Sequence, residues 1–516
     1  MTELKEKIGR STVLTFLAHF LKLAVAFVLL PYIVSTIGKE RFGLWVIVVV
    51  VTQYCGLADL GIAHPLSKYI AEYYAKREPD RINQVVTTGL AFYVVFGAVV
   101  LTVVCAMSGF FLRLFAFPPA LYPDALFALR IGVLIFVIEL AAACVTSVLR
   151  GLQRIDVTRK VQMLYVVINA AGTVLVLWMG FGLRGLFLND LACLCATAAL
   201  EIGLSFAALP SLRIARRFLS SEMFRRLFSF GIRVQMSRFS ALIGFQLDKV
   251  LIGYFLSVGL VTYYEIGAKI SFALRQLPLL VFPILVPAFS ELSVRRNRAE
   301  IYDFAVRLSK VLAFAAVPCT VFTIFAAPRF IEAWVGPGYG LSARVTRLLS
   351  VGYLADVLPL ILYAVLQGME RPHFQMWTST LSAAANLVLS VALIRWIGFI
   401  GAPLGTCIAM TVTSAFFVWI AHRFFFRVRA LPALRRTLRA PCAASALALV
   451  PLVACDRAPS LLSAPPSRLA NLGILSLQGL LFLAAYLVLA RRLGHFTREE
   501  KEELGRYVPC ARLLLG

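Results

Sequence analysis

Charged side chains interrupt the long apolar runs of this chain, and these are the residues whose chemistry needs an explanation. If the runs cross a bilayer, a charge near its centre costs roughly 2.5–3.5 kcal/mol on insertion scales, so each should serve a ligand, an ion or an internal pair. The basic residues concerned are Lys22, Arg233, Arg238, Lys249, Lys269 and Arg275. The acidic residues are Asp59, Glu139, Asp190, Glu201, Asp248, Glu265 and Asp356.

Three of the cations predict a binding site for an anion. Arg238 and Lys249 are eleven positions apart, so they are only about 20° out of phase on a helix of 3.6 residues per turn. Guanidinium and ammonium groups suit phosphate oxygens, and converging cations repel one another unless an anion joins them. We therefore predict that Lys22, Arg238 and Lys249 bind a phosphate-like group. His19, on the helix face of Lys22, and Lys269 are further candidates.

Several of these residues also have a structural interpretation. Glu265 and Lys269 are four residues apart, a spacing typical of an internal ion pair, and His19 alone would be a satisfied polar residue. Asp190 is expected to hydrogen-bond across helices. Arg275 is expected to lie close enough to the cytoplasmic surface for its guanidinium to reach it.

Three carboxylates are candidates for coupling to an ion. Glu139 and Asp356 lie at equivalent positions when the sequence is shifted by 217 residues, and Asp59 lies in the second apolar run. A buried carboxylate can exchange a proton or bind Na⁺. It can equally hold helices together by hydrogen bonds. Both interpretations stay open.

The composition identifies a polytopic membrane protein. Of 516 residues, 60% are hydrophobic and 15% are charged, and the mean hydropathy is +0.85, which a soluble fold could not bury. The net charge of +25 resides largely in short connections, as membrane topology demands, and no aromatic-basic pattern or zinc-ligand spacing accompanies it. We therefore expect no nucleic-acid partner.

Fourteen membrane-spanning helices are expected, with no soluble domain between them. Lys and Arg gather in alternate connections and in both terminal segments, which places both termini in the cytoplasm. The predicted spans lie near 11–37, 42–66, 84–109, 122–148, 157–179, 183–209, 227–256, 260–288, 303–327, 341–367, 373–397, 400–426, 437–455 and 471–491.

A repeat relates the two halves of the chain. The heptad VLRGLQR at 148–154 reappears as VLQGMER at 365–371, and the same shift places Asn169 on Asn386. We predict two six-helix lobes, 1–210 and 211–430, with helices 13 and 14 and a cytoplasmic tail in 431–516. Because six is an even number, both copies enter the membrane from the same side. The lobes should thus be related by a pseudo-twofold axis along the membrane normal, with a substrate path between them.

Enzymatic motifs are absent from the sequence. Walker A, HExxH and GxSxG do not occur, and no carboxylate cluster lies in the longer outer connections. The ten cysteines include no CxxC, and a lone CxC at 193–195 is too little for a metal site. We expect neither an enzyme nor a cofactor.

Two long segments carry a family resemblance: PYIVSTIGKERFGLWVIVVVVTQYCGLADLGIAHPLSKYIAEYY near the start, and VLQGMERPHFQMWTSTLSAAANLVLSVALIRWIGFIGAPLGT later. With fourteen spans in two halves, the chain resembles the polysaccharide-transport branch of the MOP flippase superfamily. This branch includes O-antigen and exopolysaccharide-repeat flippases, and lipid II flippases are cousins. The resemblance covers essentially the whole chain.

The resemblance implies a V-shaped, two-lobe bundle that works by alternating access. It implies an undecaprenyl-diphosphate-linked oligosaccharide as cargo, moved from the cytoplasmic to the periplasmic leaflet of the bacterial inner membrane. Cations on spans 1, 7 and 8 would then meet the diphosphate, and H⁺ or Na⁺, membrane lipids and other polysaccharide-assembly proteins would be partners. The alternatives are a cation-coupled small-molecule antiporter of the same superfamily and a non-transporting scaffold of a polysaccharide-synthesis complex.

Overall fold

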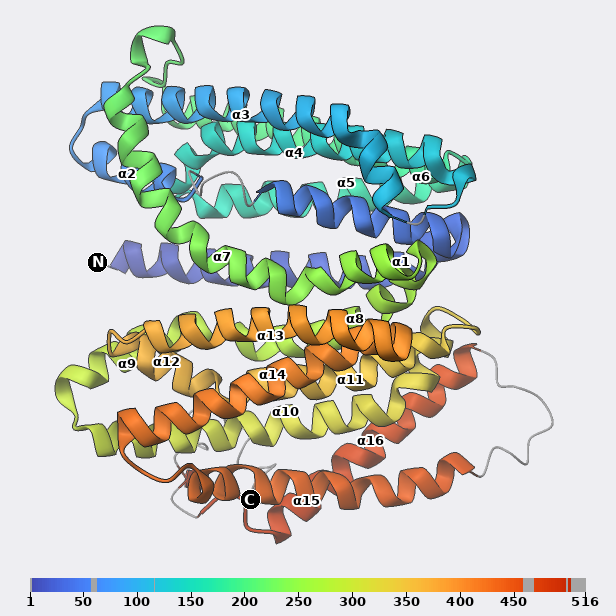
Figure 1. Ribbon diagram of the computed structural model, residues 1–516. Coiled ribbons are helices and arrows are strands. Elements are labelled where there is room, and N and C mark those ends of the chain that lie inside the picture. The colour runs from blue at the N-terminus through green and yellow to red at the C-terminus, as the bar shows by residue number, and fades with distance from the viewer. Residues whose placement is uncertain (1, 57–62, 116, 458–467, 498–499, 503–516) are drawn as a thin grey trace. The chain divides into compact units, whose positions relative to one another are not determined.

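Helices and short turns make up all of the chain that the structure describes (Figure 1). This computed structural model describes residues 2–56, 63–115, 117–457, 468–497 and 500–502, except for the side chains of 2–12, 63–64, 232–245, 454–457 and 469. Asp59 therefore lies outside the described residues, and the side chains of Arg233 and Arg238 lie outside the described part. The expectation of an all-helical protein is confirmed for the described residues.

The chain divides into two units, Met1–Thr262 and Tyr263–Gly516. The lobe boundaries at 210 and 430 come from the repeat and stay a prediction. The first unit contains α1 (Thr2–Cys55), α2 (Ala63–Ala75), α3 (Pro79–Leu114), α4 (Tyr122–Gly151), α5 (Ile155–Trp178), α6 (Gly182–Ala208) and α7 (Ser221–Phe255).

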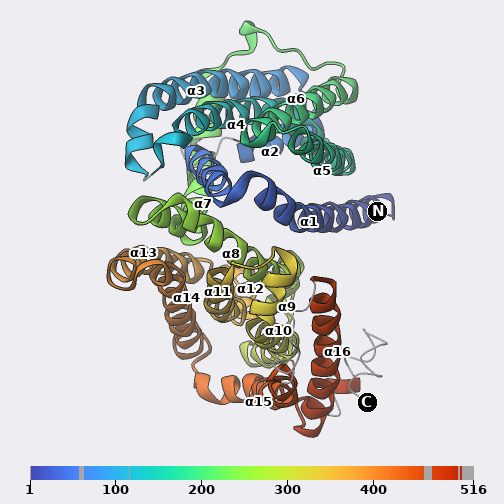
Figure 2. The same ribbon diagram turned by 90° about the vertical axis from the view of Figure 1, so that its right-hand side faces the viewer.

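The second unit begins within α8 and runs to the end of the chain. It contains most of α8 (Val258–Leu279), then α9 (Phe282–Arg295), α10 (Arg298–Trp334), α11 (Gly340–Val357), α12 (Leu360–Gly368), α13 (His373–Ile397), α14 (Gly401–Ile420), α15 (Ala430–Arg457) and α16 (Arg468–Arg492). Within this unit, α15 and α16 pack against each other and against α10 (Figure 2).

Ten helical stretches of the described chain are long and apolar enough to cross a membrane. Two of them, 13–55 and 373–426, each cover two predicted spans. At 1.5 Å per residue, the 54 residues of the second would measure about 80 Å as one straight helix, far more than a ~30 Å hydrocarbon core. Helices α7 and α15 coincide with predicted spans 7 and 13 but are not among the ten. The fourteen-span arrangement stays a prediction.

The predicted connection between spans 1 and 2 is a kink within α1. Gly38 has φ 81° and ψ 162°, a conformation that only glycine adopts readily. Beyond the kink, Gly43 lies so close to the carbonyl of Val258 that a Cβ there would be 2.0 Å from its oxygen. The hydroxyl of Thr262 donates a hydrogen bond to the carbonyl of Lys39, which fixes the kinked segment within the first unit.

The repeated heptads end two helices in the same way. In the first, Arg154 N–H donates to Leu149 O at 2.8 Å and Gln153 N–H to Arg150 O at 3.0 Å. In the second, the equivalent bonds join Arg371 to Leu366 at 2.8 Å and Glu370 to Gln367 at 3.2 Å. Gln153 and Glu370 have φ 57° and 60°, so each heptad forms a Schellman cap with a non-glycine residue in the left-handed position. The two heptads therefore have the same local structure, and the repeat of whole lobes stays a prediction.

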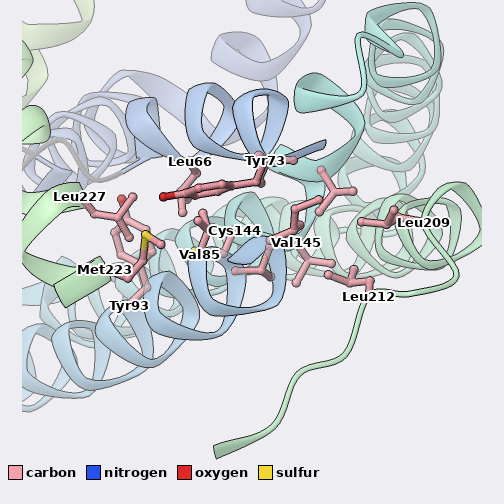
Figure 3. Packing of buried hydrophobic residues seen from close by; sticks show 14 residues of the cluster. Leu66, Tyr73, Val85, Tyr93, Cys144, Val145, Leu209, Leu212, Met223 and Leu227 are labelled. Atoms are coloured by element: carbon pink, nitrogen blue, oxygen red, sulfur yellow. The ribbon is translucent and has the colours of Figure 1, made fainter. Parts of the chain in front are cut away.

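The core of the first unit joins four of its helices near the start of α3 (Figure 3). Leu66 and Tyr73 of α2 pack with Val85 and Tyr93 of α3, and Cys144 of α4 closes the cluster. The connection between α6 and α7 contributes side chains of its own to this cluster, Leu209 and Leu212. This connection is consequently part of the packed structure.

Candidate functional site

A network of polar side chains joins α5 to α6 inside the first unit. Asp190 accepts hydrogen bonds from the hydroxyl of Tyr165 and, at 3.2 Å, from Asn169 Nδ2. Asn189 Nδ2 donates to Asn169 O at 3.1 Å and lies 3.4 Å from Thr173 Oγ1. The prediction that Asp190 bonds across helices is confirmed.

The second unit holds a matching network between α13 and α14. Asn386 Nδ2 donates to Thr406 Oγ1 at 2.8 Å, and Ser390 Oγ donates to Asn386 Oδ1 at 3.3 Å. These three residues are related to Asn169, Thr173 and Asn189 by the shift of 217. Of these pairs, only the two asparagines were predicted from the sequence. The signal for the other two positions was the same shift, applied to hydroxyl and amide residues.

Lys22 and Glu139 lie within electrostatic range of each other, although the sequence predicts different roles for them. Glu139 on α4 lies within electrostatic range of Lys22 on α1 and of Asp190 on α6. The Nε2 atom of His19, one helical turn before Lys22, is buried and has no hydrogen-bond partner among the described residues. A candidate cation, a candidate ion-coupling carboxylate and an imidazole with an unused nitrogen therefore lie around α1 in one unit.

Lys249 is buried in the first unit. The residue is 9% exposed, and it interacts with other groups of the protein, as does the neighbouring Asp248. Asp248 lies within electrostatic range of Tyr54 on α1. The structure places Lys249 where a buried cation needs compensation, but the predicted convergence with Arg238 falls outside the described side chains.

The charged candidates of the second unit are engaged in ion pairs. Arg275 Nε donates to Asp356 Oδ2 at 2.7 Å, and the Arg275 side chain is only 14% exposed. The expectation that Arg275 reaches the cytoplasmic surface is therefore wrong, because its guanidinium is directed at a carboxylate on α11. Lys269 Nζ lies 3.8 Å from Glu265 Oε1, which confirms the predicted internal pair.

An apolar cavity of about 390 Å³ lies beside the Arg275–Asp356 pair within the second unit. Its walls are formed by α8 to α12, and Arg275 is the one charged residue among the described residues that line it. Pro278 ends the regular part of α8 there, and Pro359 separates α11 from α12. Helix breaks inside a membrane are tolerated where they are buried in protein or border a cavity.

A metal ion has no candidate site in the described part of the chain. No three His, Cys, Asp or Glu side chains come together there as metal ligands would. What the described residues offer instead is a set of cations and carboxylates in apolar helices, of which Asp248 and Lys249 are buried, together with an apolar cavity.

The arrangement of helices has counterparts among solved membrane transporters. The chain resembles the lipid II flippase MurJ in its inward closed conformation, with a TM-score of 0.71, 12% identity, and coverage of 94% of this chain and 98% of that one. It also resembles an inward-facing multidrug resistance transporter of the MATE family, with a TM-score of 0.65, 15% identity, and coverage of 77% and 93%. The chain thus has the fold of these transporters, and its long apolar helices define the class as a multi-pass membrane protein.

The family follows from the sequence. The model of the polysaccharide biosynthesis protein family matches residues 8–293, more than half of the chain, and the chain belongs to this family. It is 23% identical to the probable flippase AglR of Haloferax volcanii over 84% of this chain and 85% of the relative. It is 17% identical to the putative O-antigen transporter of Shigella flexneri over 80% of this chain and 97% of the relative. The resemblance noted in the sequence is confirmed.

Proposed function

We propose that this chain is a flippase that moves undecaprenyl-diphosphate-linked oligosaccharide repeat units from the cytoplasmic to the periplasmic leaflet of a bacterial inner membrane. Family membership is the observation that carries the proposal. The relatives named as a flippase and an O-antigen transporter extend the similarity to about four fifths of the chain. The protein would act without catalysing a reaction.

The proposed mechanism is alternating access between two lobes. Fourteen spans place both termini in the cytoplasm, and the lobes at 1–210 and 211–430 are related by a pseudo-twofold axis along the membrane normal. The matching helix caps and polar networks at a shift of 217 support this repeat. Helices α15 and α16 are additional to it.

The proposed substrate site is the set of cations Lys22, Arg238 and Lys249, with His19 and Lys269 as secondary candidates. The burial of Lys249 supports a role for an anion, because a cation in a low-dielectric bundle is stabilised by the charge that it meets. His19 Nε2 is available to a ligand. Lys269 would contribute only by exchanging Glu265 for the diphosphate.

The apolar cavity of the second unit suits part of the isoprenoid chain of such a substrate. Most of the side chains that line it are Leu, Val, Ile and Ala, and apolar contact of this kind is what a hydrocarbon requires. Membrane lipids and other polysaccharide-assembly proteins complete the proposed partners.

Coupling to H⁺ or Na⁺ is proposed for Glu139, Asp356 and Asp59. The electrostatic interaction between Glu139 and Lys22 supports a link between the two events. A diphosphate bound at Lys22 would compete for the cation that stabilises the Glu139 carboxylate, so substrate binding would favour its protonation. Asp356 would first have to leave Arg275.

A cation-coupled drug antiporter is the second candidate, supported by the likeness of the fold to a multidrug transporter. The interior cations weigh against it, because a pump for cationic drugs favours an acidic interior. A scaffold that transports nothing is the third candidate. The buried charges weigh against it, since a scaffold has no need of them.

Deleting the gene in its own host tests the proposal. We expect lipid-linked oligosaccharide to accumulate in the cytoplasmic leaflet and surface polysaccharide to be lost. Loss of drug resistance with normal polysaccharide would support the antiporter instead. If the protein is a scaffold, the variant Lys22→Ala/Lys249→Ala should restore export to the deletion strain as well as the unaltered chain does.

Single variants then test the site. Lys22→Ala, Arg238→Ala and Lys249→Ala should remove most export while the protein stays abundant in the membrane, and Arg238→Lys should retain part, because it keeps the charge but not the bidentate fork. Arg435→Ala, an exposed position of α15, is the matched control. Normal export from all three at normal abundance would place the anion site elsewhere.

A further inference from the structure

The segment between α6 and α7 is held along the first turns of α3. Asn83 of α3, only 2% exposed, donates through Nδ2 to Ser211 O at 3.2 Å and accepts through Oδ1 from Arg213 N–H at 2.8 Å. Thr88 Oγ1 accepts from Ser220 N–H at 3.2 Å. One buried amide thus fixes the beginning of residues 211–220, named here the arginine segment, and one threonine fixes its end.

Apolar side chains anchor the same segment to the core of the first unit. Leu212 and Phe218 are buried, and Leu212 packs in the cluster of the first unit together with Met223, which follows the segment (Figure 3). A short 3₁₀ turn at Arg216–Phe218 directs Phe218 inward. The remaining side chains are exposed because the backbone is fixed in this position.

The outward face combines arginines with exposed aliphatic side chains. Arg213, Arg216 and Arg217 are exposed, and Ile214 and Leu219 are 40% and 50% exposed. Aliphatic side chains beside arginines are typical of elements that lie in a membrane interface.

The charges of the arginine segment are not neutralised by the protein around it. No ion pair involves Arg213, Arg216 or Arg217 among the described residues; Arg217 instead lies over the Phe218 ring at 4.9 Å. Glu222, in the first turn of α7, is 2.8 Å from Arg226 and 3.9 Å from Arg81. The face therefore has net positive charge available to an external anion.

The position along α3 places the segment near the level of lipid headgroups. Helix α3 has 36 residues, about 54 Å at 1.5 Å per residue, against a hydrocarbon core of ~30 Å. Asn83 and Thr88 lie roughly 6 and 14 Å beyond the start of the helix at Pro79. Figures 1 and 2 both place the segment on the outside of α3, on the side away from α1.

We propose that the arginine segment is a binding surface for anionic phospholipid headgroups. Arg213, Arg216 and Arg217 would bind the phosphates through their planar guanidinium groups, while Ile214 and Leu219 would enter the interface between headgroups and acyl chains. An acidic protein partner would account for the arginines but not for the aliphatic side chains. The proposal is independent of the substrate that the protein transports.

The test uses the full chain in detergent, titrated with dioleoyl-phosphatidylglycerol or dioleoyl-phosphatidylcholine. Thermal unfolding and native mass spectrometry would report stabilisation and the number of lipids bound. We expect the anionic lipid to raise the Tm more than the zwitterionic lipid does. Arg213→Gln/Arg216→Gln/Arg217→Gln should lose at least half of this difference and at least one bound phosphatidylglycerol.

Matched variants make the outcome decisive. Arg435→Gln/Arg436→Gln/Arg439→Gln removes the same charge from exposed positions of α15 and should keep the difference. Ile214→Asn/Leu219→Asn keeps every charge and should weaken binding of the anionic lipid several-fold. If the segment variant fails to fold, Ile214→Asn/Leu219→Asn still decides the question, because unchanged binding of the anionic lipid by that variant would contradict the proposal.

Three results would overturn the proposal. If the segment variant and the α15 control lose bound lipid equally, only the total charge of the protein matters. No preference for phosphatidylglycerol in the unaltered chain would remove the lipid as partner. Equal stabilisation by millimolar glycerol phosphate, with no dependence on the arginines or on Ile214 and Leu219, would point to a soluble anion bound elsewhere.

Discussion

The ion pair between Arg275 and Asp356 links α8 to α11 beside the apolar cavity. Asp356→Ala removes the carboxylate that accepts from the guanidinium, so we expect a loss of about 1–3 kcal/mol in stability. Arg275→Ala/Asp356→Ala should recover part of it, because the buried cation is removed as well. Thermal unfolding of the purified variants measures both effects. If the loss from the double variant equals the sum of the losses from Asp356→Ala and Arg275→Ala, the pair contributes nothing.

The same residue separates a structural role from ion coupling. Asp356→Asn cannot ionise yet keeps the size of the side chain and an acceptor for Arg275, and Glu139→Gln is the equivalent change in the first unit. If either carboxylate couples transport to an ion, its amide variant should abolish the dependence on pH or Na⁺ at normal membrane abundance. Unchanged ion dependence in both variants would reduce these carboxylates to structural groups.

Charge inside an apolar run is visible in a sequence, but its partner is not. Spacing within one helix predicted the Glu265–Lys269 pair, and the structure contains it. Arg275 was assigned to the membrane surface, because its partner is 81 positions away on a helix whose rotation the sequence leaves open. Lys22 and Glu139 were assigned separate roles for the same reason.

At the scale of elements, the two Schellman caps should respond alike to glycine. Gln153 and Glu370 are exposed and occupy the left-handed region, where an L-residue is strained by its Cβ. Gln153→Gly and Glu370→Gly should each stabilise the protein by about 0.5–1 kcal/mol, net of the entropy cost of glycine. The β-branched controls Gln153→Val and Glu370→Val should lower the Tm. If glycine destabilises either cap, the residue at that cap does not have the left-handed conformation.

Titratable side chains bind the segment after α16 to α10. Lys310 Nζ lies 2.6 Å from Glu500 Oε2, His495 Nε2 lies 3.1 Å from Lys310 O, and the His495 ring stacks on Phe314. Burial lowers the pKa of His495 below its ordinary value, although its hydrogen bond to Lys310 O opposes the shift. Burial alone would raise the pKa of Glu500, but hydrogen bonds from Lys310 and Thr497 outweigh it and hold that pKa low.

Both shifts predict release of this segment on acidification. Below the ordinary His pKa near 6.5, His495 is protonated more readily in the free segment than in the docked one, so acidification favours release. Glu500 adds to this effect only below about pH 4.3, as the pH falls through its lowered pKa. The protection factors of residues 493–497, which correct the measured exchange for its intrinsic dependence on pH, should therefore fall between pH 7.5 and 5. His495→Gln should flatten that fall, whereas Lys310→Met should weaken docking by about 1–3 kcal/mol at every pH. Protection factors that do not change with pH in the unaltered chain would contradict the account.

Helical segments were easier to predict than their interruptions. Hydropathy located the apolar helices, since length and composition suffice for that. The predicted loop at Gly38 is a kink within α1, and Pro359 divides a predicted single span into α11 and α12. Such breaks depend on tertiary neighbours, for example the close approach of Gly43 to Val258. Local sequence does not encode these neighbours.

At the scale of the whole molecule, the repeat is the strongest prediction made from sequence. A shift of 217 residues, found in one heptad and a few polar residues, also relates two helix caps and the Asn169 and Asn386 networks. The family followed from longer segments of the same sequence. The proposed cargo rests on the family, and the cations Lys22 and Lys249 predict only that it carries a phosphate-like anion.

Transport of a lipid diphosphate by the purified chain tests the central claim most directly. Vesicles would contain a fluorescent undecaprenyl-diphosphate oligosaccharide in both leaflets, and a membrane-impermeant quencher would report how fast the inner pool becomes accessible. We predict rapid exposure of this pool with the unaltered chain, slow exposure with Lys22→Ala/Lys249→Ala, and little exposure of the same glycan on an uncharged polyprenol. An inner pool that stays protected, or equal rates for the charged and uncharged lipids, would contradict the proposed function.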